Sequence, residues 1–144
     1  TDAGMDLYAK EDITVPSIPH MIFKYCKWLF WGAVSCKEDT DNFLATKIHT
    51  NIAFEIPKGQ VGLIMDRSSM GSKLIKTLGG VIDSGYRGEV SVCLMNLSFT
   101  DYEVRAGDKV AQMLIVPCNL AKPIKVSKLS DTERGSKGFG SSGK

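Results

Sequence analysis

The chain has 144 residues, a length that fits one domain with a hydrophobic core of its own. Its 18 basic residues nearly balance its 16 acidic residues, and the net charge of +2 argues against binding to nucleic acid through phosphate neutralisation. No apolar run reaches the length of a membrane span and no signal peptide is recognisable, so we expect neither a membrane anchor nor secretion.

The cysteines indicate the expected compartment. The four cysteines include no Cys-x-x-Cys pair, and the spacing of the cysteines and the two histidines matches no zinc-binding motif. We therefore expect reduced cysteines and a cytoplasmic location, or the cytoplasm or nucleus of a host cell if the protein is viral. A disulfide framework is the alternative.

Residues 20–34 are the first distinctive stretch, because they hold both tryptophans and several other large apolar side chains. The stretch lies between the prolines at 16 and 19 and the charged residues 37–41. We interpret it as an inserted hairpin or short helix that packs on the body of the protein or on a neighbouring subunit. The alternative is an exposed patch that binds a protein partner.

Alternating hydrophobicity identifies the strands that follow. From 44 to 56 the even positions are apolar or β-branched, which predicts one half-buried strand ended by the turn at 57–59. Further apolar runs follow at 61–65, 90–97 and 110–116, and loop compositions separate them at 101–102 and 106–108. Short strands with Gly and Pro between them predict an all-β sandwich or barrel.

Residues 79–89 form a glycine-rich stretch that holds one acid, Asp83, after an apolar triplet. Tyr86 follows Asp83 at three residues and Arg87 at four. A carboxylate held beside an aromatic face suits a general base next to a ring-shaped substrate, because an ordinary aspartate is ionised at neutral pH. The alternative is a β-turn in which Asp83 caps its own backbone.

The C-terminal residues 134–144 are rich in glycine and serine and include Arg134 and Phe139. This composition predicts a mobile segment whose main-chain amides and serine hydroxyls could wrap an anion. The alternative is a disordered terminus without a function.

Five stretches of the sequence, in this order and spacing, resemble the five motifs of the trimeric dUTP diphosphatases (dUTPases). They are Ala3-Gly4-Met5-Asp6-Leu7, Asp66-Arg67-Ser68-Ser69, residues 80–89, Gly107-Asp108-Lys109-Val110-Ala111-Gln112, and residues 134–143. The resemblance spans nearly the whole chain, and only residues 18–43 have no counterpart in the common core of that family.

The resemblance implies one domain over residues 1–144 with an all-β, dUTPase-type jelly roll of the β-clip kind, assembled as a homotrimer. Residues 18–43 would be a family-atypical insertion, and residues 134–144 a flexible tail that closes over the active site of a neighbouring subunit. The implied reaction is the Mg²⁺-dependent hydrolysis of dUTP to dUMP and pyrophosphate, which lowers dUTP and supplies dUMP for dTMP synthesis.

Carried over by position, the resemblance also implies roles for the residues at the nucleoside end of the substrate. Asp83 would be the general base that activates the attacking water. Tyr86 would stack on the deoxyribose and exclude a 2′-hydroxyl. The backbone of Gly80, Val81 and Ile82 would bind the edge of the uracil.

The triphosphate would be bound by several motifs together. Its ligands would be Arg67, Ser68, Ser69, Gln112 and Arg134, while Phe139 would cover the uracil and Gly140, Ser141 and Ser142 would close on the γ-phosphate. Mg²⁺ would be carried by the substrate phosphates and its own waters, with no direct protein ligand. Asp6 would support this network through water.

Three positions depart from the family pattern. Asp66 stands where relatives often have Pro or Gly, and its charge near Arg67 would weaken triphosphate binding. Thr77 is a candidate substrate-binding residue that stands where many relatives use an Asn to bind uracil, so recognition would depend more on backbone groups. Lys137 replaces a common glycine, and its positive charge could offset Asp66.

Two alternatives to a dUTPase follow from the same residues. The dCTP deaminases resemble the chain at residues 82–86, but they need a glutamate about ten residues after the aspartate, where this chain has Cys93. The second alternative is a dUTPase fold kept as a regulatory or binding protein that uses the aromatic insertion. The presence of both Asp83 and Tyr86 argues against it, because a pure binding protein has no use for a base.

Overall fold

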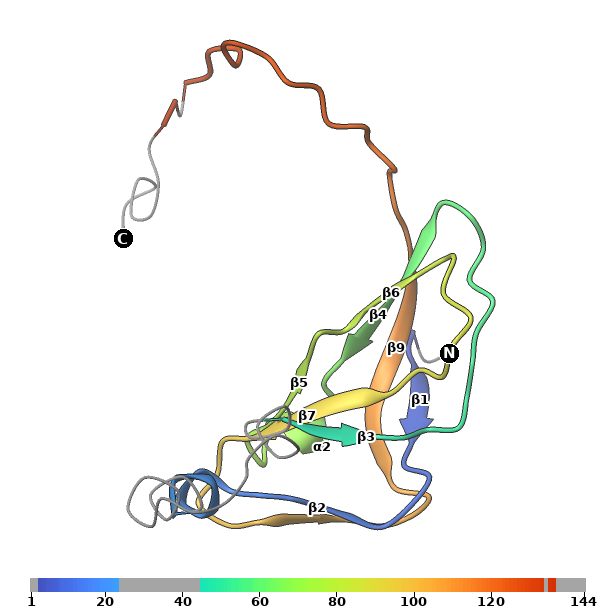
Figure 1. The fold of residues 1–144 in the computed structure, drawn as a ribbon, viewed down its shortest axis with the longest axis vertical. Coiled ribbons are helices and arrows are strands. Elements are labelled where there is room, and N and C mark those ends of the chain that lie inside the picture. The colour runs from blue at the N-terminus through green and yellow to red at the C-terminus, as the bar shows by residue number, and fades with distance from the viewer. Residues whose placement is uncertain (1–2, 24–44, 134, 137–144) are drawn as a thin grey trace, which may run out of the picture.

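The computed structural model describes residues 3–23, 45–133 and 135–136. Its body consists of short strands with little helix (Figure 1). Residues 18–23 are helical. The other elements, in chain order, are β1 (Met5–Tyr8), β2 (Ile13–Val15), β3 (Thr46–Ile48), β4 (Gln60–Met65), α2 (Ser68–Gly71), β5 (Ile75–Leu78), β6 (Val81–Asp83), β7 (Val92–Asn96), β8 (Tyr102–Val104) and β9 (Lys109–Pro117).

Every strand pair in the described residues is antiparallel, and the strands form three sheets. The largest sheet has the order β1-β9-β4-β6, the second β3-β7-β5, and the third pairs β2 with β8. Strands from opposite ends of the chain are therefore neighbours, as β1 and β9 are. This arrangement confirms the predicted all-β class.

The core lies where the buried faces of these sheets meet, and period-two alternation places it there. In β7, Val92, Leu94 and Asn96 are buried, while Cys93 and Met95 between them are half-buried. Burying one branched aliphatic side chain stabilises the fold by about 1.5–3 kcal/mol, so these positions fix the register of each strand. Other large side chains in the cluster are Leu7, Val15, Ile48, Ile75, Val104, Val110 and Met113.

The prediction of one continuous strand over residues 44–56 is wrong. Strand β3 ends at Ile48, and Asn51 has a left-handed φ of 58°. Beyond β3, isolated hydrogen bonds replace the regular backbone pairing of two strands. The Thr50 hydroxyl donates to the carbonyl of Val90 at 2.6 Å, and the N–H of Val90 donates to the carbonyl of Ile52 at 2.8 Å. Alternation alone identified a half-buried extended segment but not the point where its pairing ends.

The helical residues 18–23 form the beginning of the predicted insertion, and the loop before β8 holds them in place. The Asp101 carboxylate accepts the N–H of Ser17 at 2.7 Å and contacts Nδ1 of His20 at 2.7 Å. The backbone bond from Ser17, followed by the bond from His20, lowers the pKa of Asp101 to about 2. Residues 24–44 lie outside the described residues, so the packing and any partner of 20–34 stay predictions.

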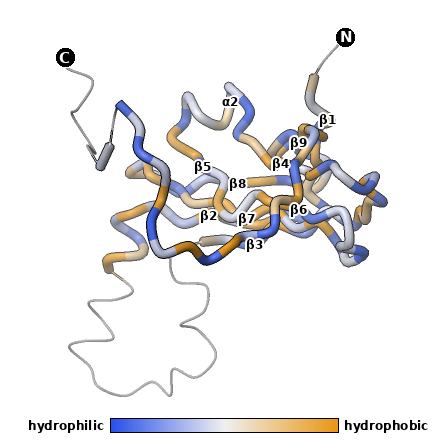
Figure 2. Tube along the Cα trace, turned by 90° about the horizontal axis from the view of Figure 1, so that it is seen from above, coloured by the Kyte–Doolittle hydropathy of each residue, from blue (hydrophilic) through white to orange (hydrophobic). Residues whose placement is uncertain are grey.

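After β9, residues 119–133 extend away from the body, and we call this segment the arm (Figure 1). Hydrophobic and hydrophilic residues alternate along it (Figure 2). Its apolar side chains are 54% to 83% exposed, and they belong to Leu120, Ile124, Val126 and Leu129. The arm thus carries apolar side chains that the described part of its own chain leaves exposed.

Candidate active site

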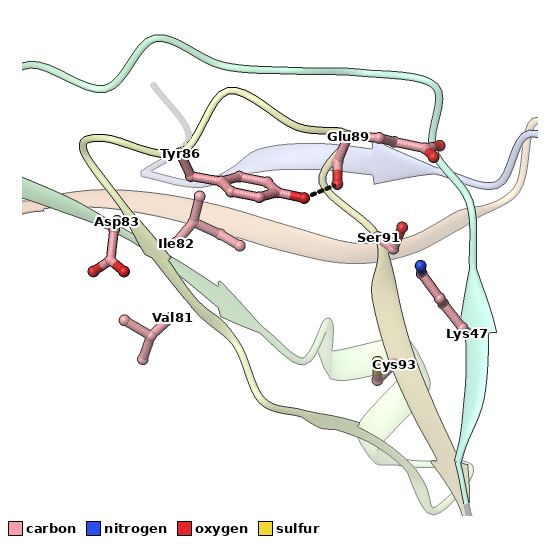
Figure 3. Close-up of a pocket in the computed structure, with 8 residues that line it drawn as sticks. All are labelled: Lys47, Val81, Ile82, Asp83, Tyr86, Glu89, Ser91 and Cys93. Atoms are coloured by element: carbon pink, nitrogen blue, oxygen red, sulfur yellow. Dashed lines mark hydrogen bonds between the residues drawn. The ribbon is translucent and has the colours of Figure 1, made fainter. Parts of the chain in front are cut away.

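A cleft of about 290 Å³ opens beside β6, and Val81, Ile82 and Asp83 form one wall of it. Tyr86, in the turn after β6, lies at the same wall (Figure 3). The remaining lining residues are Lys47 from β3, Glu89, and Ser91 and Cys93 at β7. This volume is close to the lower limit for small-molecule sites, and it is large enough to accept a planar ring.

Strand β6 is the edge strand of the largest sheet, because β4 is its only strand neighbour among the described residues. Just before β6, the carbonyl of Gly80 accepts the N–H of Ile64 at 2.7 Å. A Cβ at Gly80 would lie 2.5 Å from the Ile64 carbonyl oxygen, so only glycine allows this close approach. The outer edge of β6 presents main-chain N–H and C=O groups that can bind the edge of a planar ring.

The turn after β6 determines how Tyr86 is oriented. Its N–H donates to the carbonyl of Asp83 at 3.0 Å, and its hydroxyl donates to the carbonyl of Glu89 at 2.9 Å. A Cβ at Gly88 would lie 2.5 Å from that hydroxyl oxygen, so glycine is needed for the ring to take this position. Tyr86 is 43% exposed and Asp83 is exposed too, so both residues are accessible to a ligand.

A second group of predicted site residues lies at the opposite end of β4, where the chain enters α2. Asp6 contacts Nε of Arg67 at 3.0 Å and Nζ of Lys109 at 2.8 Å. The hydrogen bond from Lys109 is the main cause that lowers the pKa of Asp6, and the charge of Arg67 acts in the same direction. Because Asp6 contacts Nε, the terminal nitrogens of Arg67 can still make a bidentate contact with phosphate. Ser68 and Ser69 are exposed beside Arg67.

Asp66 connects this group to β5 and β9. Its carboxylate accepts the N–H and the hydroxyl of Thr77, each at 2.7 Å, and pairs with Lys76, while its carbonyl accepts Nε2 of Gln112 at 2.9 Å. Burial acts to raise the pKa of Asp66, but the bonds from Lys76 and Thr77 outweigh it and the pKa is lowered. The negative charge expected to weaken phosphate binding at Arg67 is therefore paired with Lys76 on β5.

The two groups are far apart within one chain. Asp83 pairs with Val61 near the start of β4, whereas Met65 at its end pairs with Gln112, which also pairs with Asp6. At ~3.3 Å per residue, the four to six residues between the two ends correspond to about 13–20 Å. The ion pair with Asp6 keeps Arg67 at the Gln112 end. One chain thus brings together Val81, Ile82, Asp83 and Tyr86, and separately Asp6, Arg67 and Gln112.

Several predicted residues cannot be placed. Arg134, Lys137, Phe139, Gly140, Ser141 and Ser142 lie outside the described residues. Thr77 lies beside Asp66 rather than in the cleft, and whether it contacts uracil stays a prediction. In the part of the chain that the structure describes, no group of three or more His, Cys, Asp or Glu side chains could hold a metal ion. The two cysteines described, Cys93 and Cys118, are free thiols.

The structure adds residues that the sequence did not single out. Lys47 and Cys93 are direct neighbours across β3 and β7, and both line the cleft. Glu89 also lines it, and its carboxylate contacts His49 Nδ1 at 2.8 Å. Glu89 was within reach of sequence reasoning because it closes the same glycine-rich stretch as Asp83. Lys47 and His49 gave no such signal, since they lie about forty residues earlier and their positions depend on strand pairing.

No helix in the described ranges is long and apolar enough to cross a membrane.

The fold and the site define an all-β protein with a small cleft at one edge strand and a separate group of cationic and hydroxyl side chains. Comparison with known proteins identifies the family. The family model described as dUTPase matches residues 40–143. The deoxyuridine 5′-triphosphate nucleotidohydrolase of Clostridium novyi is 34% identical over 145 residues, which cover 99% of this chain and 84% of that protein. The chain belongs to the dUTPase family.

Solved structures agree with this assignment. The dUTPase of Staphylococcus bacteriophage 80alpha with dUPNHPP has a TM-score of 0.74 and 27% identity, covering 99% of this chain and 87% of that one. A variant of the dUTPase from phage phi11 of S. aureus, solved to show the coordination of a structural Mg(II) ion, has a TM-score of 0.66 and 25% identity, covering 91% and 87%. Both share the fold over most of their length.

Proposed function

We propose that this enzyme hydrolyses dUTP to dUMP and pyrophosphate with Asp83 as the general base. The observation that carries the proposal is the cleft in which Asp83, Tyr86 and the edge of β6 lie together. A carboxylate accepts a proton from water as the water attacks the phosphate chain, and pyrophosphate leaves with the electrons of the broken P–O bond. Asp83 then releases its proton to solvent, to which it is exposed.

Two features of the same wall would select the nucleoside. Uracil would bind to the main-chain groups of Gly80, Val81 and Ile82 on the outer edge of β6, because these groups can pair with the ring as a neighbouring strand would. The ring of Tyr86 would stack on the deoxyribose. A 2′-hydroxyl would then collide with the ring, and steric exclusion discriminates against ribonucleotides.

The phosphates would be bound by Arg67, Ser68, Ser69 and Gln112 of a neighbouring copy. A base that acts at the phosphate chain must lie within a few ångströms of it, whereas in one chain the backbones of Arg67 and Asp83 are separated by about 13–20 Å along β4. This separation supports the proposed homotrimer, in which each site combines Asp83 from one subunit with Arg67 from another.

The arm supports the same assembly. Its exposed apolar residues would be covered on an adjacent subunit, and the arm leads directly into the tail. The tail residues Arg134, Phe139, Gly140, Ser141 and Ser142 would close over the nucleotide there. These roles rest on the resemblance of the sequence to the family motifs.

Mg²⁺ would be the cofactor, held by the substrate phosphates and its own waters. The described donors fit this arrangement, because both oxygens of Asp6 already contact cationic side chains and Asp6 would reach the ion only through water. When bound, Mg²⁺ would neutralise charge on the phosphate oxygens. Arg67 would add a fixed positive charge, and the two serine hydroxyls would orient the phosphate chain.

A second, regulatory function has one supporting observation. Ile22 and Phe23, at the start of the aromatic insertion, are both more than half exposed, which is consistent with a partner contact there. The phage 80alpha structure in the comparison is described as a dUTPase that controls transfer of virulence genes. Such a role for this chain would be additional to hydrolysis. A cytoplasmic location likewise remains a proposal.

The replacement Asp83→Asn tests the catalytic assignment. Asparagine preserves the shape of the side chain but cannot accept the proton, so we expect kcat to fall by at least ~10²-fold while a non-hydrolysable dUTP analogue still binds. Pyrophosphate release and calorimetric titration measure the two effects. Turnover within a few-fold of the parent would show that Asp83 is not the base.

Mixing two inactive variants tests the shared site. Asp83→Asn and Arg67→Ala are unfolded and refolded together at equal concentration, so that about three quarters of the trimers contain both chains. If the site is shared between subunits, each mixed trimer has one complete site in three, and about a quarter of parental activity returns. If both residues serve the same site within one chain, no mixed trimer has a complete site and activity stays at background.

A further inference from the structure

The glycine-rich hairpin that carries Asp83 and Tyr86 is bonded to residues 49–51, which lie outside the predicted motifs. The Tyr86 hydroxyl donates to the main-chain carbonyl of Glu89 at 2.9 Å. The orientation of the ring therefore depends on where the backbone of Glu89 lies. Glu89 follows the exposed residues 85–88, and its neighbour Val90 is bonded through its N–H and its carbonyl to the segment after β3. The side chain of Glu89 adds a further attachment to the same segment.

Both carboxylate oxygens of Glu89 are bound by the segment after β3. Oε1 accepts the N–H of Asn51 at 2.7 Å, and Oε2 accepts a hydrogen from Nδ1 of His49 at 2.8 Å. The bond from His49, followed by the bond from Asn51, lowers the pKa of Glu89. Hydrogen bonds to an ionised carboxylate are shorter and stronger than neutral ones.

The partner segment is itself held firmly. The carbonyl of His49 accepts the N–H of Lys10 at 2.8 Å, which connects it to the chain after β1. Asn51 takes its left-handed φ of 58°, a conformation in which its N–H is directed at Glu89. Non-glycine residues in this region are uncommon and persist where the surrounding structure holds them.

We propose that His49 and Glu89 are positioning residues for sugar selection, and we call the pair the latch. By fixing the backbone of Glu89, the latch holds the Tyr86 ring where it meets C2′ of the sugar. Neither residue needs to touch the substrate for this effect. The inference rests on the proposed function, because it assumes that Tyr86 contacts the deoxyribose.

The ratio of kcat/KM for dUTP to that for UTP measures the effect of the latch on sugar selectivity. In Glu89→Ala the carbonyl of residue 89 remains, but the side-chain bonds to Asn51 and His49 no longer hold it in place. The ring can then move away from a 2′-hydroxyl, so we expect the ratio to fall at least about fivefold. Glu89→Gln keeps one oxygen for Asn51 and can donate its amide to His49, so it should retain most of the selectivity. His49→Asn should do the same, because its amide can replace the Nδ1 donor.

A double-mutant cycle shows whether His49 and Glu89 affect sugar selectivity together or independently of each other. If His49 acts through Glu89, the variant with both residues changed to alanine should have the same selectivity as Glu89→Ala alone. The matched control is Glu55→Gln, since the Glu55 side chain is 83% exposed and contacts Arg87 of the same hairpin at 3.4 Å. An exposed ion pair of this kind contributes little, so the control should keep the parental ratio.

Tyr86→Ala distinguishes failure of the latch from failure of the proposed function. If Tyr86→Ala loses selectivity and Glu89→Ala keeps it, Tyr86 selects the sugar but the latch is refuted. If Tyr86→Ala keeps the parental ratio, the sugar contact fails and the latch fails with it. A Glu89→Ala protein that is less stable but equally selective also refutes the latch, because only a structural role would then remain.

Discussion

Replacing Gly80 with alanine tests how closely the hairpin that carries Asp83 must lie against β4. The added Cβ would sit 2.5 Å from the carbonyl oxygen of Ile64 and 3.2 Å from its Cβ. A carbon atom and an oxygen atom that are not bonded do not approach each other this closely in proteins, so β6 must move by about 0.5 Å or more. The carbonyl of Gly80 also accepts the N–H of Ile64 at 2.7 Å, and this movement would strain or break that bond.

The expected loss of stability follows from these two effects. Overpacking costs about 1–3 kcal/mol and a lost hydrogen bond about 0.5–1.5 kcal/mol, so we expect a loss of about 2–4 kcal/mol per chain. With a urea m-value of about 2 kcal/mol/M, the unfolding midpoint should fall by about 1–2 M. Because assembly shifts apparent stability, parent and variant must be compared at one protein concentration.

Activity should fall as well, because Asp83 and Tyr86 lie directly after Gly80 in the same hairpin. Displacing catalytic groups by as much as 1 Å can cost ~10²-fold, so a shift of about half that distance should reduce kcat/KM about 10-fold or more. Steady-state pyrophosphate release from dUTP measures this loss in variant protein that is fully folded at the assay temperature.

Gly85→Ala is the matched control, because Gly85 lies in the same hairpin, in the turn after β6, has no positive φ, and its added Cβ would meet no atom within 4 Å. It should keep the parental urea midpoint and activity. The reasoning is refuted if Gly80→Ala is as stable and active as the parent, or if both alanine variants are impaired equally.

Two further predictions concern the base of the insertion and the arm. Asp101→Asn should destabilise the protein near pH 7, because a carboxylate with a lowered pKa stabilises the fold above its ordinary pKa and loses this effect when it is protonated. The difference in stability from the parent should therefore shrink as the pH falls from 3.8 to about 2. Thermal unfolding at a series of pH values measures this difference, and a difference that stays constant would refute the prediction. Changing Ile124 and Leu129 together to Asp should raise the concentration at which the proposed trimer dissociates by ~10²-fold or more, since burying each side chain is worth about 1.5–3 kcal/mol. Analytical sedimentation measures this concentration, and the control Lys125→Asn should leave it unchanged. No effect of the double variant would mean that the arm is not buried on a neighbouring subunit.

The fold class could be predicted from sequence because its strands have clear period-two burial. The run at 61–65 became β4, and the run at 110–116 became most of β9. Residues 44–56 show the limit of this reasoning. Their alternation continues past Ile48, but pairing requires a partner strand, and β7 provides one only opposite residues 46–48. Nothing local to the sequence states which distant strand is adjacent.

The site was predictable to the same extent. Residues 80–89 are contiguous, so Asp83 and Tyr86 could be assigned together and the structure places them at one cleft. His49 and Lys47 could not be found, because they reach Glu89 and the cleft only through the pairing of β3 with β7. The orientation of Asp66 toward Lys76 was equally hidden, since it depends on β5 lying beside the end of β4.

Strand β4 connects the two groups of candidate site residues, and its pattern of buried side chains fixes its register. Its start pairs with Asp83 and its end leads into Arg67, while Gly62 and Ile64 between them are buried. A slip of one residue would expose both buried positions and turn Met65 inward, so the core strongly disfavours it. The same slip would move Asp83 by ~3.3 Å relative to Arg67. The hydrophobic pattern of one strand therefore fixes where the chain presents the proposed base, Asp83, and where it presents the proposed phosphate ligand, Arg67.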